Sequence, residues 1–506
     1  MSQLQDQYIK RILSARVYDV SVETRLHEAA QLSKRLGNAV WLKREDEQQI
    51  FSFKCRGAFN RIHKLMQERS VAGVIAASAG NHAQGVALAA QKLGLHAVIV
   101  MPQTTPGIKV EAVRALGAEA LLHGDDFDTA LPHALKLSEQ RGYPFIHPFD
   151  DPDTIAGQGT VGVELCRQHP GPLDAVFVPV GGGGLAAGIS VYLKYLRPDV
   201  RIVGVEPVDA ASMHDSLLAD ERIVLDQVGQ FADGVAVRQV GKYSFELCRE
   251  YLDEVVLVTV DEISAAIKDI FNDTRTLTEP AGALAVAGMK RYVRERGVSG
   301  QTLIAVNSGA NINFDRLRHV AERVEIGESR EALLGVTIPE QPGSFLAFCR
   351  SLGKRRITEF NYRYADTDMA HVFAGVELSG GADERDALMS HLRDNGYEVL
   401  DMTHNDTAKL HLRHMIGGHA GMSSERLYRF VFPERPGALL DFLQAMGQRW
   451  NITLFHYRNH GAAYGRVLVG MSLPEGEEDK LSNFIATLGY KVEDESANEA
   501  YSLFLR

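Results

Sequence analysis

The sequence has few cysteines and no long apolar run, and both absences narrow the class of protein. Four cysteines in 506 residues stand far apart, as Cys55, Cys166, Cys248 and Cys349, so neither a disulfide framework nor a zinc site is expected. No segment approaches the roughly 20 consecutive apolar residues of a membrane-spanning helix. Residues 1–20 carry several charges and no apolar core, unlike a secretory signal. We therefore expect a cytoplasmic protein.

The chain also lacks an excess of positive charge. It has 54 Lys and Arg residues against 65 Asp and Glu residues, a formal net charge of -11, and no basic block stands out. Nucleic acids and anionic membranes are bound through basic surfaces, so neither partner is expected.

The hydrophobic content of 45% is ordinary for a globular protein, and the length predicts roughly three to four domains.

Residues 1–320 alternate short apolar runs with stretches of helical periodicity. The runs that predict strands are 71–76, 97–101, 119–122, 174–180, 201–205, 254–260 and 302–306. The stretches between them that predict helices include 127–140 and 159–168. Strand, helix and strand at this spacing are typical of parallel strands covered by helices. We therefore predict one α/β catalytic region built as two lobes with a cleft between them.

The last third of the sequence repeats itself after a charged segment at 321–331, which we interpret as a linker. The repeated segments are 336–346 with 430–440, and 357–363 with 452–458. Each copy reads strand, Pro-Gly turn, helix, two strands, helix, strand, which is the order of ferredoxin-like modules. We predict two such α+β domains, at 332–403 and 426–497.

Lys54 stands in an unusual position for a lysine. Phe51 and Phe53 precede it, and an apolar helical run begins at Ala58, whereas lysine is normally a solvated surface residue. In a dry setting its pKa falls and the amine becomes a nucleophile toward a carbonyl carbon. On this stretch alone, a lysine whose stem packs at a helix start while its charge reaches water is the commoner explanation.

A run of four glycines follows the predicted strand at 174–180 and opens a helix at Leu185. Its members are Gly181, Gly182, Gly183 and Gly184. Without side chains, an oxyanion can approach the backbone at a helix N-terminus, and a phosphate is the expected guest. The run also fits G-x-G-x-x-A, completed by Ala186, and Glu206 follows 20 residues later, as in dinucleotide-binding dehydrogenases. The run alone supports both guests equally.

Two further loops follow predicted strands, at the sheet edge where ligands bind in α/β proteins. One reads Ser78, Ala79, Gly80, Asn81, His82 and leads into a helix. Its backbone N–H groups favour a carboxylate, while Asn81 either binds a cofactor hydroxyl or only caps the helix. The other loop carries Ser308, whose hydroxyl would face the ligand, although a serine before a glycine more often serves a turn.

Together and in this order, S-F-K-C-R-G-A, S-A-G-N-H-A-Q-G, G-G-G-G-L and S-G-A-N resemble the motifs of fold type II pyridoxal-phosphate enzymes of the threonine/serine dehydratase group. The two C-terminal repeats resemble the ACT-like pair of biosynthetic threonine deaminases. The resemblance covers about residue 16 to the end. It implies a tryptophan synthase β-like catalytic domain at 1–320, with a smaller lobe at about 49–144 inserted in the larger one. It also favours phosphate at the glycine run.

The resemblance implies a role for each motif. Lys54 would carry pyridoxal 5'-phosphate and act as the base, Phe53 would lie against the cofactor ring, and Asn81 would bind the ring hydroxyl. The glycine run with Leu185 would bind the phosphate, and Ser308 would face the pyridine nitrogen. The substrate carboxylate would lie at Ser78, Ala79, Gly80, Asn81 and His82, and no metal is expected.

The implied reaction converts L-threonine to 2-oxobutanoate and ammonia, the first step of isoleucine synthesis. The resemblance further implies a homotetramer inhibited by isoleucine, with valine relieving the inhibition. Two alternatives stay open at this point. One is an L-serine dehydratase of the same family, and the other is a nicotinamide-dependent dehydrogenase that uses residues 181–186.

Overall fold

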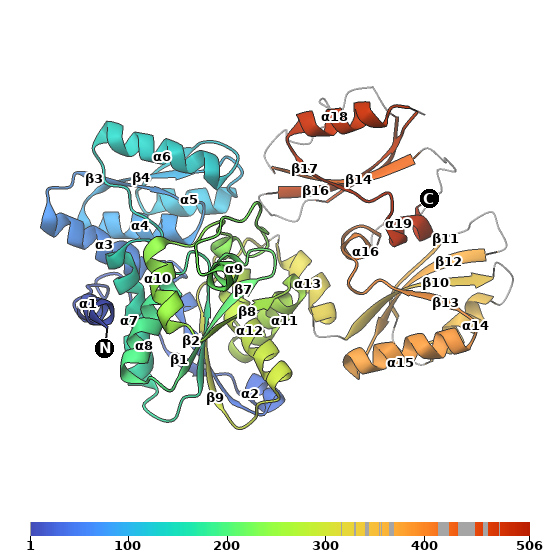
Figure 1. Cartoon of the computed structure of the whole chain (residues 1–506), viewed down its shortest axis with the longest axis horizontal. Coiled ribbons are helices and arrows are strands. Elements are labelled where there is room, and N and C mark those ends of the chain that lie inside the picture. The colour runs from blue at the N-terminus through green and yellow to red at the C-terminus, as the bar shows by residue number, and fades with distance from the viewer. Residues whose placement is uncertain are drawn as a thin grey trace. The chain divides into compact units, whose positions relative to one another are not determined.

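A computed structural model gives the fold. It describes residues 2–505 except 315, 328–329, 340–343, 354, 356, 364–368, 413–424, 434–450, 459–463 and 475. The chain divides into two compact units, Met1–Val320 and Ala321–Arg506, coloured from blue to yellow and from yellow to red in Figure 1. Among the described residues, no helix is long and apolar enough to cross a membrane. The finer domain limits at 332–403 and 426–497 stay predictions.

The larger lobe of the first unit contains a six-stranded sheet in the order β1-β2-β9-β6-β7-β8. The strands are β1 (Leu26–Glu28), β2 (Ala39–Arg44), β6 (Ala175–Pro179), β7 (Arg201–Pro207), β8 (Glu254–Val258) and β9 (Thr302–Asn307). All neighbours are parallel except β1 and β2. In the register, Val176 of β6 lies opposite Ile202 of β7 and Ile304 of β9. These apolar runs are buried because helices cover a parallel sheet.

Four helices of the larger lobe cover this sheet or pack on a helix that does. Helix α12 (Pro280–Arg296) packs along β6, β7, β8 and β9, and α8 (Gly184–Leu196) contacts β6. Helices α7 (Pro152–Gln168) and α10 (Lys242–Tyr251) pack on α8. The sequence predicted α7 only from residue 159. Its true start is Pro152, capped by the Asp151 side chain.

The smaller lobe contains a three-stranded parallel sheet in the order β3-β4-β5. Its strands are β3 (Gly73–Ala77), β4 (His96–Met101) and β5 (Glu119–Leu122), and its helices are α3 (Lys54–Glu68), α4 (Asn81–Leu93), α5 (Gly107–Ala115) and α6 (Phe127–Arg141). Helix α3 packs closely on α7 of the larger lobe. A Cβ on Gly157 of α7 would lie only 2.7 Å from the Cα of Gly57 in α3, so glycines allow the two helices to come this close. The predicted two-lobed α/β fold is confirmed.

The second unit contains two four-stranded antiparallel sheets with the same strand order, visible in orange and red in Figure 1. The first is β11-β12-β10-β13 and the second is β15-β16-β14-β17. Their strands are β10 (Glu331–Pro339), β11 (Ile357–Arg363), β12 (Met369–Glu377), β13 (Glu398–Asp401), β14 (Glu425–Pro433), β15 (Asn451–Arg458), β16 (Tyr464–Ser472) and β17 (Lys491–Asp494). The described helices that cover them are α14 (Ser344–Ser351), α15 (Gly381–Asp394) and α18 (Glu478–Leu488). The shared order confirms the duplicated ferredoxin-like fold.

Three more helices join or flank these modules. Helix α13 (Arg316–Gly327) covers most of the segment interpreted as a linker, which is therefore largely helical. Short helices α16 (Asp406–Leu410) and α19 (Glu499–Phe504) follow the first and second module. Their caps bond to each other, since Asn405 Nδ2 donates to Asn498 Oδ1 at 3.3 Å.

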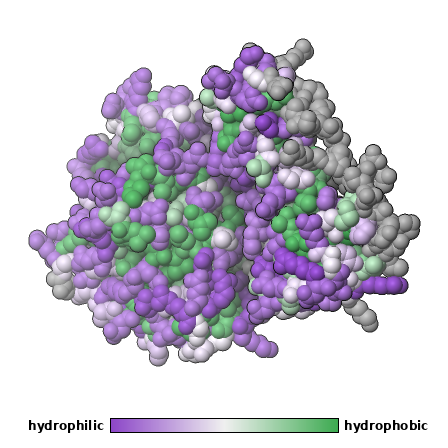
Figure 2. All heavy atoms as spheres, turned by 45° about the vertical axis from the view of Figure 1, so that its right-hand side comes forward, coloured by the Kyte–Doolittle hydropathy of each residue, from purple (hydrophilic) through white to green (hydrophobic). Residues whose placement is uncertain are grey.

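The surface mixes hydrophilic and hydrophobic residues. Figure 2 shows purple and green residues interspersed over one face of the molecule. Large apolar side chains that are well exposed include Leu13, Ile108, Leu218 and Phe314. Such a mixture is ordinary, because apolar atoms form much of any protein surface.

Candidate active site

Lys54 is the first residue of α3, and its amine lies in a dry setting. The side chain is half-buried. Its Nζ donates to the Pro148 carbonyl oxygen at 3.0 Å and lies 5.2 Å from the centroid of the Phe53 ring. Burial lowers the pKa of Lys54 to about 8, although the nearby Glu279 carboxylate opposes the shift. The amine is therefore far more nucleophilic near neutral pH than an ordinary lysine.

The loop before Lys54 pairs with the loop that carries Ser308. Phe53 N donates to Ser308 O at 3.3 Å, and Ala310 N donates to Phe51 O at 2.9 Å. Phe51 has a φ of 53°, a strained value for a bulky residue and one typical of functional loops. The Ser308 hydroxyl is buried and donates to Ala281 O at 3.4 Å. Two motifs about 250 residues apart in the sequence are thus side by side.

Asn81 of the second loop is held by side chains from the larger lobe. Its Nδ2 donates to Glu279 Oε1 at 2.6 Å, and its Oδ1 accepts from Asn311 Nδ2 at 2.7 Å. The N-cap of α4 is Gly80, and no side chain caps the helix. The alternative in which Asn81 only caps the helix is therefore wrong.

The five residues predicted for the substrate carboxylate differ in their placement. The first four, Ser78, Ala79, Gly80 and Asn81, are half-buried, and Ser78 Oγ accepts from Gly80 N at 3.2 Å. The His82 ring is instead buried, with Nε2 2.8 Å from Ile146 O. Burial lowers the pKa of His82 to about 3, so the ring is neutral. The His82 ring is therefore engaged by Ile146 O, and only the backbone N–H of His82 is left as a candidate donor to the substrate.

The four glycines at 181–184 have close neighbours that leave no room for side chains, and they also leave the backbone open to an anion. A Cβ on Gly182 would lie 2.2 Å from the Phe149 ring, and one on Gly181 would lie 2.8 Å from the Val235 Cα. Gly183 caps α8 with a φ of 91° and no side-chain cap bond. The first N–H groups of a helix lack intrahelical partners, so this uncapped, glycine-lined end fits a phosphate group.

A loop that the sequence did not single out connects these motifs. Pro148 accepts from Lys54, and the ring of the next residue, Phe149, packs on Gly182. Asp150 accepts from the first two backbone N–H groups of α10, each at 2.8 Å. This 147–150 loop carries no periodic or glycine signal, so only the structure identifies it.

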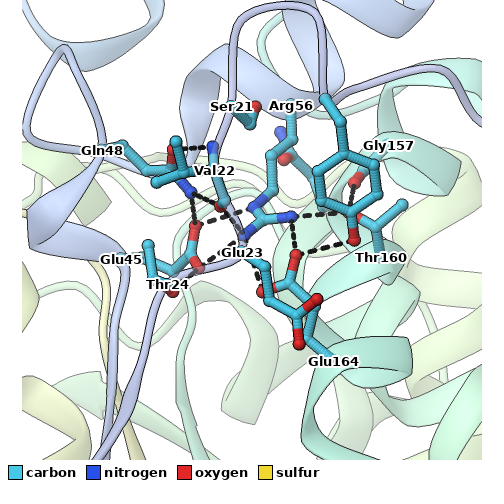
Figure 3. Close-up of polar contacts among 12 residues, drawn as sticks. Ser21, Val22, Glu23, Thr24, Glu45, Gln48, Arg56, Gly157, Thr160 and Glu164 are labelled. Carbon is cyan, nitrogen blue, oxygen red and sulfur yellow. Dashed lines mark hydrogen bonds and ion pairs between the residues drawn. The ribbon is translucent and has the colours of Figure 1, made fainter. Parts of the chain in front are cut away.

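The first turn of α3, which begins at Lys54, is held by a group of fully buried charged side chains. These are Lys43, Glu45, Arg56 and Glu164, and we call them the buried quartet. Figure 3 shows the Arg56 guanidinium between the two carboxylates. Arg56 Nη1 lies 2.6 Å from Glu164 Oε1, Arg56 Nε lies 2.8 Å from Glu45 Oε2, and Lys43 Nζ lies 2.6 Å from Glu164 Oε2. Each charge is partnered, as a buried charge must be. The quartet thus ties the first turn of α3 to β2 and α7.

Glu206, the residue that suggested a dinucleotide, is engaged elsewhere. It is buried, and its carboxyl accepts from Met213 N at 2.9 Å and His214 N at 2.8 Å. Burial raises the pKa of Glu206 to about 8. The carboxyl stabilises the start of α9 (Ser212–Ala219) and is not directed at a ribose.

Comparisons with known proteins agree with this geometry. The family described as "Pyridoxal-phosphate dependent enzyme" matches residues 18–309, and the "C-terminal regulatory domain of Threonine dehydratase" matches 322–412 and 416–505. The L-threonine dehydratase biosynthetic IlvA of Burkholderia multivorans is 53% identical over 502 residues, 98% of this chain and 99% of the relative. The chain belongs to the biosynthetic threonine dehydratases. The predicted cofactor, lyase class and threonine dehydratase activity are confirmed, and the nicotinamide alternative is wrong.

Other biosynthetic threonine dehydratases and solved structures extend this result. The Escherichia coli K12 relative is 50% identical over 500 residues, 99% of this chain and 97% of the relative. The processed form of threonine deaminase isoform 2 from Solanum lycopersicum has a TM-score of 0.62 at 50% identity, covering 64% of this chain and 94% of that one. Serine racemase from Dictyostelium discoideum has a TM-score of 0.55 at 30% identity, covering 62% of this chain and 98% of that one.

Proposed function

We propose that Lys54 carries the pyridoxal phosphate and acts as the general base in the dehydration of L-threonine to 2-oxobutanoate and ammonia. The observation that carries this proposal is the Lys54 amine, whose pKa of about 8 results from burial. When bound, the cofactor supplies an electron sink that makes the substrate α-proton acidic. Lys54 Nζ then takes that proton, because an amine with a pKa near the working pH is an efficient base.

The other motifs would bind and orient the cofactor and the substrate. The N-terminus of α8 and the glycines before it, Gly181 to Leu185, would bind the phosphate, and the backbone N–H groups at 78–82 would bind the substrate carboxylate. Phe53 would lie against the cofactor ring, and Asn81 would bind its hydroxyl. The Ser308 hydroxyl would donate to the pyridine nitrogen without protonating it, in place of its 3.4 Å bond to Ala281 O. A neutral partner leaves the ring a weaker electron sink than a carboxylate would, which favours expulsion of the β-hydroxyl.

Two substitutions test these roles. Lys54→Ala is expected to lower kcat by several orders of magnitude, because it removes the covalent anchor and the base together. Ser308→Asp is expected to divert flux from elimination, measured as 2-oxobutanoate formed per threonine consumed. Deamination at the parent rate in either variant would contradict the assignment of that residue.

Substrate preference within the family needs its own measurement. We propose L-threonine as the preferred substrate and L-serine as a poorer one, on the strength of relatives named threonine dehydratases. A kcat/KM for L-serine well above that for L-threonine would reassign the enzyme to the serine dehydratases.

We further propose that the second unit binds isoleucine as an inhibitor and valine as its antagonist, in a homotetramer. Support comes from the two matches to a regulatory domain and from the duplicated sheets. The turns expected to offer N–H donors to a free amino acid, 340–343 and 434–437, lie outside the described residues. The alternative is a purely structural pair that builds the oligomer, since regulation requires differential binding to two states.

Rate curves distinguish these alternatives. Isoleucine is expected to steepen a sigmoidal dependence on threonine, and valine to relieve it. A chain ending after Gly327, the last residue of α13, should stay active and become insensitive to isoleucine. If millimolar isoleucine changes neither the rate curve nor the melting temperature of the full chain, the regulatory proposal is wrong. Sedimentation equilibrium of the full chain tests the tetramer.

A further inference from the structure

Glu279 is a buried carboxyl group at the active site to which the proposed mechanism gives no role. It is 3% exposed at the start of α12, and its backbone N donates to Gly309 O at 3.2 Å. A Cβ on Gly309 would lie 2.4 Å from Glu279 Oε1. The carboxyl group therefore lies directly beside the Ser308 loop, and its Oε1 receives Asn81 Nδ2 at 2.6 Å.

The hydrogen bonds around Asn81 determine which end of its amide points where. Asn311 Nδ2 donates both to the Ile50 carbonyl oxygen at 2.8 Å and to Asn81 Oδ1 at 2.7 Å. A backbone carbonyl and an ionised carboxylate can only accept. These hydrogen bonds form a series that runs from Ile50 through Asn311 and Asn81 to Glu279. The groups at its two ends, the Ile50 carbonyl and the Glu279 carboxylate, are therefore both acceptors. A flipped Asn81 amide would place two donors together at Asn311 and two acceptors together at Glu279.

We propose that Glu279 is a positioning residue, which fixes the Asn81 amide so that its second N–H is directed at the ring hydroxyl of the cofactor. This inference rests on the proposed role of Asn81. The bond also joins the lobes, because Asn81 begins α4 of the smaller lobe and Glu279 precedes α12 of the larger. An orientation enforced by a charged acceptor is stronger than one enforced by a neutral group.

The charges near Glu279 make this positioning sensitive to pH. Burial and the neighbouring Asp233 raise the pKa of Glu279 to about 7, while Lys109, Arg316 and the Asn81 bond oppose the rise. The Lys54 amine also interacts with the carboxylate. Below about pH 7 a protonated Glu279 is a neutral and therefore weaker acceptor, so it holds the Asn81 amide less firmly, while Asn311 still donates to Asn81 Oδ1. Cofactor affinity is therefore expected to fall as the pH drops from 8 to 6.

A double-mutant cycle on cofactor binding tests the proposal. Equilibrium dialysis of the holoenzyme gives the pyridoxal phosphate dissociation constant, and the visible absorption of the bound cofactor gives a second readout. Asn81→Ala and Glu279→Ala are each expected to weaken binding about tenfold, the size of a lost charge-assisted hydrogen bond. Glu279→Gln should have an intermediate effect, since a neutral amide can face Asn81 with either end. It should also weaken the dependence of affinity on pH between 6 and 8, leaving the part that the Lys54 amine contributes.

The cycle separates this inference from the proposed function. If Glu279 acts through Asn81, the double variant binds no more weakly than Asn81→Ala alone. Additive losses, or an unchanged affinity in Glu279→Ala while Asn81→Ala is weakened, would overturn the inference and leave the role of Asn81 intact. An unchanged affinity in Asn81→Ala would overturn both.

A matched control shows whether any loss is only structural. Asp269 is 3% exposed and its carboxylate pairs with Arg35 and Lys290, away from the motifs of the site. Asp269→Asn is expected to lower the melting temperature and leave cofactor affinity unchanged. If Asp269→Asn weakens cofactor binding as much as Glu279→Ala does, the positioning role is refuted.

Discussion

Replacing Glu164 by glutamine should destabilise the catalytic unit more than any change to an exposed ion pair. Glu164 is fully buried and accepts from Lys43 Nζ at 2.6 Å, from Arg56 Nη1 at 2.6 Å and from Tyr18 Oη at 2.9 Å. In Glu164→Gln, Glu45 is the one carboxylate of the quartet that remains to balance the two buried cations, Lys43 and Arg56. An uncompensated charge then remains in the interior.

The expected cost follows from the burial of all four charges. Removing one partner of a buried ion pair typically costs about 3–5 kcal/mol. Domains are stable by only about 5–15 kcal/mol, so the loss is a large fraction of the total. The double variant Lys43→Met with Glu164→Gln restores the charge balance, with Arg56 opposite Glu45. It should be less destabilised than the sum of the two single variants.

Hydrogen exchange followed by mass spectrometry is the suitable assay, because the chain has two compact units and a single unfolding free energy is not well defined for multidomain proteins. Peptides from β2, α3 and α7 report on the quartet. The control is Glu111→Gln, since Glu111 pairs with Arg114 at 2.7 Å while 70% of the Glu111 side chain is exposed, and exposed pairs contribute little. Exchange in Glu164→Gln no faster than in the control would refute the reasoning, as would strict additivity in the double variant.

Two further predictions concern pH and packing. Burial lowers the pKa of His82 to about 3 and of His147 to about 4, from 6.5. At these two rings the unfolded chain binds more protons below pH 6.5, so each ring contributes stability above that pH that is lost toward pH 5, whereas the raised pKa values of Glu206 and Glu279 act in the opposite sense. Between pH 7.5 and pH 5, the melting temperature of His147→Gln should therefore fall less, or rise more, than that of the parent. The same pH dependence in His147→Gln and in the parent would contradict this. Gly182→Ala should destabilise by about 1–3 kcal/mol through overpacking, and Phe149→Ala should partly rescue it. Equal melting temperatures with and without the second change would show that Phe149 is not the obstacle.

The elements that the sequence predicted best are those with a strong local pattern. Strand β5 (Glu119–Leu122) was predicted at its observed bounds, and α6 (Phe127–Arg141) within one residue at its end. Helix α7 was predicted seven residues short, because its first half is rich in small residues such as Gly157 that weaken the apolar periodicity. The start signal was present in Asp151 and Pro152, a side-chain cap followed by a proline at the first helical position.

The candidate site was predictable only in part, for a physical reason. Motifs such as the glycine run act through local backbone geometry, which leaves a trace in the sequence. The partners of Lys54 and Asn81, by contrast, are Pro148 and Glu279, residues 94 and 198 positions away. Contacts between such distant residues arise from tertiary packing and carry no periodic signature. Asn311 was visible in its motif, but its bond to Asn81 was not.

The central claim is that Lys54 carries the cofactor, and one measurement tests it directly. Borohydride reduction of the holoenzyme makes the link between pyridoxal phosphate and its lysine permanent, and peptide mapping by mass spectrometry then locates the label. The account predicts the label on Lys54, in a peptide that trypsin does not cut at that residue. A label on any other lysine, including the fully buried Lys43, would contradict it.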